Sequence, residues 1–201
     1  MPAFSPIPAP VMTIWDAPVT ANQRLPGIWH VTTASHGGFI LSEERQAAMP
    51  QALRLDGSAY EEDVNWSLVV LAFQDELRAA SDSTFAIEAD LAHQIARSWL
   101  PDRYTAFTGT PVEPRESYVL QRRAAYEANI GKIVVVSAFG DWADWVPAGK
   151  VGVIGRRVRS VNHLGNATYE GADSRALVDA DSYSSSAIVN AFDAIGAEPL
   201  A

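Results

Sequence analysis

The chain keeps its strand-like and helix-like patterns in separate consecutive blocks, and this separation is the strongest constraint on its fold. β-Branched and aromatic residues dominate 28–33 and 39–41, helical patterns occupy 42–131, and strand patterns return from residue 133. A doubly wound sheet would need strands and helices in alternation. The sequence therefore predicts an α+β fold with a small N-terminal β unit, three central helices and a mostly antiparallel C-terminal sheet.

The first part of the helical block carries two start signals. Residues 42–50 predict a short helix that a proline ends. Ser58 and Glu61 then have the spacing of a capping box, shortly before the apolar run 66–73. Because that run is apolar on nearly all sides, it predicts a buried central helix.

Two more helices and several strands are expected further along the chain. Residues 85–100 predict a helix ended by Pro101, and a third helix is expected over 110–131. The helix over 85–100 has an apolar stripe, typical of a face packed on a core: Ile87, Leu91, Ile95 and Trp99. The strand patterns that follow cover four segments: 133–139, 151–161, 176–178 and 187–192.

Size and composition favour one compact domain. The 201 residues are 48% hydrophobic and 19% charged, which is enough apolar material for one sizeable core. Prolines interrupt the first residues, so 1–24 are expected to form an extended tail and 25–201 a single globular domain. The N-terminus lacks the basic region of a secretory signal, and no apolar run approaches the roughly 20 residues that span a bilayer.

Charge and cysteine usage exclude several classes of partner and chemistry. With 24 acidic against 15 basic residues the formal net charge is −9, which disfavours direct binding to a phosphate backbone. The chain has no cysteine, so disulfides, thiol nucleophiles and cysteine-based zinc sites are excluded. A reducing cytoplasmic location is therefore expected, without a membrane partner.

Two short polar segments are the candidate centre of function. In the first, His36 precedes Gly37 and Gly38, which would let a substrate or another backbone approach an imidazole able to act as a base or ligand. The alternative is a histidine held by hydrogen bonds in an ordinary turn.

The second segment places Tyr60 before three consecutive carboxylates, Glu61, Glu62 and Asp63. Carboxylates in the first turn of a helix need no functional role, because the backbone dipole favours them there. Three adjacent carboxylates repel one another, however, so one should face the body of the fold. If Glu62 or Asp63 meets His36, an acid–base pair results, with Tyr60 as a polar orienting group.

Metal and nucleotide binding have weaker signals. His36 and Glu62, with His30 or His93, could furnish ligands, but they lack a short fixed spacing such as HExxH. The glycines form neither a dinucleotide-binding nor a P-loop pattern. No metal or other cofactor is predicted.

Tryptophan is abundant, with six in the chain, and two lie in one predicted loop: Asp141-Trp142-Ala143-Asp144-Trp145. Because tryptophan is enriched in binding hot spots, Trp142 and Trp145 with a rim of Asp141 and Asp144 predict a protein-binding surface. Packing of the loop onto its own sheet is an equally good interpretation.

Parts of the chain resemble a domain family of unknown function found in bacterial plasmid, integrative-element and phage proteins. The resemblance rests mainly on 29–31, 35–38, 44–50, 60–63 and Trp66, and more loosely on three later segments: 145–147, 151–153 and 177–183. It implies an accessory protein of a mobile element and no particular reaction.

Two functions of different class follow. The preferred one is a mobile-element accessory protein that binds a host or element-encoded protein, for example as an inhibitor of a host defence system. The alternative is a small hydrolase or transferase centred on His36 and a neighbouring carboxylate.

Overall fold

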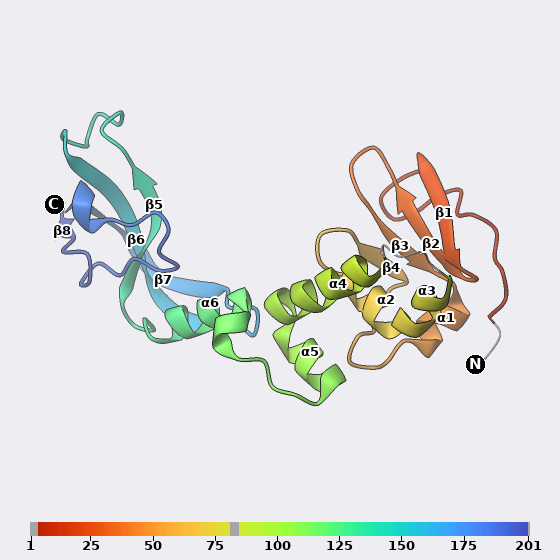
Figure 1. The fold of residues 1–201 in the computed structure, drawn as a ribbon. Helices are drawn as coiled ribbons and strands as arrows, with labels where there is room; N and C mark the ends of the chain where they lie inside the picture. Colours follow the sequence, from red (N-terminus) through yellow and green to blue (C-terminus); the bar gives the residue numbers. More distant parts are fainter. Residues whose placement is uncertain (1–3, 81–84, 201) are drawn as a thin grey trace. The chain divides into compact units, whose positions relative to one another are not determined.

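The computed structural model describes residues 4–80 and 85–200, and the chain divides into two compact units, 1–117 and 118–201. Each unit contains an antiparallel sheet and at least one helix (Figure 1), so the predicted α+β class is confirmed. The single domain over 25–201 stays a prediction. Among the described residues, no helix is long and apolar enough to cross a bilayer.

The N-terminal unit begins with a four-stranded antiparallel sheet, whose strands follow one another in chain order: β1 (Thr20–Leu25), β2 (Ile28–Thr32), β3 (Gly37–Leu41) and β4 (Ala59–Glu61). Part of the expected N-terminal tail thus belongs to β1. Pro26 and Gly27, the latter with a φ of 76°, form the two-residue connection that pairs Leu25 with Ile28.

The described part of this unit, 4–80 and 85–117, also contains the following helices: α1 (Glu43–Ala48), α2 (Trp66–Ala72), α3 (Gln74–Ala80), α4 (Phe85–Trp99), α5 (Pro101–Thr108) and the 3₁₀ turn η1 (Pro114–Glu116). The apolar run predicted as a buried helix is α2, and Leu68 to Leu71 on it are buried. It packs against α4, β3 and β4, so a single large apolar cluster joins the helices to the sheet.

The capping box at Ser58 does not start a helix. Residues 59–61 pair with β3 as strand β4, and the helix begins only at Trp66. Backbone pairing with a neighbouring strand therefore outweighs a local capping signal at Ser58 and Glu61.

The apolar stripe of α4, predicted to pack on the core, instead lies largely in solvent. Ile87 is 73% exposed and Leu91 46% exposed, whereas Ala89, Ala92 and Ala96 are buried. Small side chains let two helices approach closely, and this alanine face packs in the cluster with α2.

The helix expected over 85–100 ends before Pro101 as predicted, because α4 covers Phe85–Trp99, whereas the helix start expected at Thr110 is wrong. Pro101 occupies the first turn of α5, where a missing N–H is not needed, and Gly109 ends that helix with a φ of 72°. The next long helix starts at Tyr118 instead of Thr110, and it ends shortly before Gly131 as predicted.

The C-terminal unit consists of α6 and a second antiparallel sheet, with these elements: α6 (Tyr118–Glu127), β5 (Ile133–Phe139), β6 (Lys150–Val161), β7 (Ala167–Asp179), η2 (Ala180–Ser182) and β8 (Glu198–Pro199). Its apolar residues form two small clusters. The strand predicted at 187–192 is reduced to one bridge between Ala191 and Val134, so this segment covers the sheet without joining it as a regular strand.

Candidate functional site

The two polar segments singled out in the sequence are hydrogen-bonded neighbours in the N-terminal unit. Strand β3 pairs with β4 so that Gly38 lies opposite Glu61 and Phe39 opposite Tyr60. The backbone N–H of Glu62 extends this pairing by donating to the carbonyl of Gly37 at 3.0 Å. Two segments more than twenty residues apart in sequence therefore lie side by side at one end of the sheet.

Gly38 is needed for this close approach, and Gly37 lies directly under the Glu62 carboxylate. A Cβ at Gly37 would collide with the carboxylate of Glu62, and one at Gly38 would collide with the carbonyl of Tyr60. Gly38 also has a φ of 143°, a conformation that side chains other than glycine rarely adopt. Gly38 thus permits the close packing of β4 against β3.

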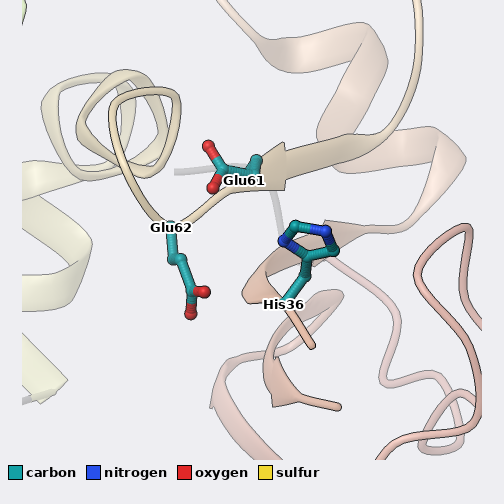
Figure 2. A group of neighbouring side chains, drawn as sticks. All are labelled: His36, Glu61 and Glu62. Carbon is teal, nitrogen blue, oxygen red and sulfur yellow. The ribbon is translucent and has the colours of Figure 1, made fainter. Parts of the chain in front are cut away.

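His36 stands at the tip of the β2–β3 hairpin. Its backbone is fixed by Thr33, because the Thr33 N–H donates to the His36 carbonyl at 2.7 Å and the His36 N–H donates to Thr33 Oγ1 at 3.1 Å. The imidazole itself is exposed. Figure 2 shows it beside the end of β4, and one ligand atom from each of His36, Glu61 and Glu62 lies within 4.8 Å of the other two.

Glu62 also lines a pocket of about 280 Å³ on the same unit, whose walls come from β1, β2, β3, α2 and α4. The lining residues combine charged, imidazole and aromatic groups: Arg24, His30, Gly38, Phe39, Glu62, Trp66 and Glu88. Mixed apolar and convergent polar groups are typical of sites for small ligands.

An ion pair and an edge-on contact between two rings line this pocket. Arg24 donates to both carboxylate oxygens of Glu88, with Nη1–Oε1 at 3.2 Å and Nη2–Oε2 at 2.7 Å. The His30 ring packs edge-on against Phe39, with 5.4 Å between ring centroids. Burial, and then the positive charge of Arg24, lower the pKa of His30, while Glu88 and Glu62 oppose this shift.

The remaining residues of the predicted centre lie elsewhere. Tyr60 is fully buried in the core, and its hydroxyl donates to Gln46 Oε1 at 2.9 Å and accepts from the Leu55 N–H. This places its hydroxyl among core partners and not beside His36. Asp63 is exposed and belongs neither to the group around His36 nor to the pocket lining.

The predicted tryptophan loop lies in the C-terminal unit, and its two tryptophans differ. Trp142 is 74% exposed, and Asp141 and Asp144 are exposed beside it. Trp145 is half-buried, stands 5.5 Å from the ring of Phe139, and occupies the space that a Cβ on Gly152 would need. The loop is therefore anchored by one tryptophan and displays the other.

The sequence interpretation missed Arg24 and Glu88. Arg24 had been placed in the tail, and Glu88 is 64 residues away on a helix whose apolar stripe was expected to face the core. The Pro26-Gly27 pair was the available signal, since a two-residue turn would have revealed β1 and its register with His30.

Comparison with known families gives a match over the first part of the chain. The model of a domain of unknown function, DUF7007, matches residues 8–130. This segment contains the pocket and His36, whereas the tryptophan loop lies outside it. No curated protein and no solved structure matches the chain.

Proposed function

The chain belongs to the DUF7007 family, and we propose that the part it shares with that family contains the centre of a small hydrolase or transferase. The observation that carries this proposal is the convergence of His30, Glu62 and the Arg24–Glu88 pair on one pocket with two aromatic walls. The centre expected at His36 is thereby moved to His30, and Glu62 is retained from the sequence interpretation.

The chemistry follows from the types of group in the pocket. An imidazole and a carboxylate can take a proton from an attacking water or hydroxyl and return it to a leaving group. Arg24, paired with Glu88, lines the pocket with hydrogen-bond donors for a polar substrate group, and the half-buried Trp66 offers a face for a planar or apolar part. The substrate class is accordingly a small molecule with one polar and one flat or apolar portion.

The first test is a ligand-observed NMR screen of small fragments, followed by chromogenic ester, phosphoester and glycoside substrates. Fragments and any turnover should be lost in His30→Gln. The matched control is Asp90→Asn, which removes an exposed carboxylate from the same helix as Glu88. Binding that is unchanged in His30→Gln would contradict the proposed centre.

A second function is favoured by the exposure of Trp142: a mobile-element accessory role in which the C-terminal unit binds a host or element-encoded protein, such as a component of a host defence system. Trp142→Ala should abolish capture of that protein by the tagged full chain, while Ile130→Ala, a change at another exposed apolar residue of the unit, should not. Trp145→Ala is unsuitable because that ring packs on its own sheet. Equal capture by wild type and Trp142→Ala would contradict this surface.

A further inference from the structure

We propose that His36, Glu61 and Glu62 bind one divalent transition-metal ion of the zinc type at the edge of the pocket. The three side chains come from the β2–β3 connection and the end of β4 (Figure 2), and their ligand atoms lie within 4.8 Å of one another. Among the described residues, this is the group of histidine and acidic side chains that could converge on a single ion.

The type of ligand selects the class of ion. One imidazole nitrogen with two carboxylate oxygens suits zinc and related transition metals, whereas magnesium and calcium prefer oxygen ligands alone. Three protein ligands leave further coordination positions for water, which is the pattern of catalytic and not of structural zinc.

The three ligand atoms need to move only a short distance toward one another to coordinate an ion. Ligands about 2.0–2.1 Å from a tetrahedral ion lie about 3.3 Å apart, so side chains now within 4.8 Å must approach by about 1.5 Å at most. His36 and Glu62 are exposed and can rotate, while their backbones are fixed by Thr33 and by the Glu62–Gly37 hydrogen bond. The ion would thus join residues whose main chains already have fixed positions.

Glu62 connects the cation site with the pocket, because it belongs to both. A water bound to the ion would lose its proton more readily than bulk water and would lie beside the pocket as a nucleophile. This catalytic role rests on the proposed function, but binding of the ion does not.

The test is calorimetric titration of the full chain with Zn²⁺ alone, without any substrate. One ion should bind per chain, and His36→Ala and Glu61→Gln should each weaken binding about tenfold or more, at least as much as loss of a supporting residue does. Co²⁺ should give an absorption spectrum in the wild type that is lost in the same variants. Mg²⁺ should bind weakly and without dependence on His36.

The matched control is Asp63→Asn, which removes one negative charge from the same segment but no member of the group. Retained affinity in this control, with loss in His36→Ala, supports coordination. Equal loss in both variants indicates diffuse electrostatic attraction and overturns the site, as does the absence of saturable Zn²⁺ binding. His30→Gln should leave Zn²⁺ affinity unchanged, so failure of the cation site and failure of the pocket are separately visible.

Discussion

The N-terminal unit surrounds one large apolar cluster with helices and a sheet, whereas the C-terminal unit distributes its apolar residues over two small clusters on a long sheet. In the first, large aliphatic side chains such as Leu68 fill the interior. In the second, glycines let aromatic rings lie directly on the strands, as Gly155 does for Phe192. Removal of core volume should therefore cost more in the N-terminal unit than in the C-terminal unit, and the strands of the C-terminal sheet should be sensitive to volume added at Gly155.

The largest effect is expected from removing core volume in the N-terminal unit. Leu68→Ala deletes a fully buried side chain between helix and sheet, and should lower the free energy of unfolding by about 2–5 kcal/mol. Urea denaturation measures this loss. The matched pair is Val69→Ala in the large cluster and Val153→Ala in the smaller cluster of the other unit, both fully buried valines, and Val153→Ala should cost less. An equal or larger cost at Val153 would break the comparison.

A second test concerns the buried charge of the N-terminal unit. Arg45 is 1% exposed, donates to Glu76 at 3.0 Å and to the Pro26 carbonyl at 2.9 Å, and packs on the Phe73 ring. Arg45→Met should lower the free energy of unfolding by about 2–3 kcal/mol, because the partly exposed Glu76 loses its partner.

The control for Arg45 is an exposed ion pair on α3. Arg78 bonds to Asp75 at 3.1 Å with both side chains mostly in solvent, so Arg78→Met should change stability by about 1 kcal/mol or less. Similar losses for Arg45→Met and Arg78→Met would show that burial of Arg45 contributes little.

A third test adds volume on strand β6 of the C-terminal unit. A Cβ at Gly155 would lie 2.5 Å from Phe192 Cζ and 2.7 Å from Ile133 Cγ2, so Gly155→Ala should cost about 1–3 kcal/mol in thermal or urea unfolding. Gly57→Ala is the control, since no heavy atom lies within 4 Å of its added Cβ. If Gly155→Ala unfolds at the same urea concentration as the wild type, Gly155 is not needed for the packing of Phe192 on the strand.

The smallest expected effect is a dependence of folding stability on pH, caused by the partly buried His30 of the N-terminal unit. The pKa of His30 is lowered in the folded chain, so as pH falls below the ordinary value of 6.5 the unfolded chain binds the proton first and stability decreases. Arg24 adds to this effect, and Glu88 and Glu62 oppose it. His30→Gln should flatten the loss of stability on acidification, measured as urea midpoints between neutral and mildly acid pH. An unchanged slope would contradict the burial of His30 as its cause.

Much of the candidate site was accessible from sequence because its members are chemically unusual where they stand. His36, Gly37, Gly38 and Glu62 were identified from their types and neighbours, and the structure brings them to one sheet edge. Tyr60 was attributed to the same centre only because it is adjacent in sequence. Strand alternation sends the Tyr60 side chain into the core, while the next residue, Glu61, has a carboxylate oxygen within 4.8 Å of an imidazole nitrogen of His36.

The sequence by itself determined the α+β class, the buried helix at 66–72 and the antiparallel C-terminal sheet, because these follow from local apolar patterns and from turn and end signals. Only the tertiary structure decided that Ser58 to Glu61 form a strand, that α4 packs through alanines, and that Arg24 and Glu88 meet across 64 residues. Each of these depends on pairing between distant segments. The energy of that pairing exceeds the local preference of each segment.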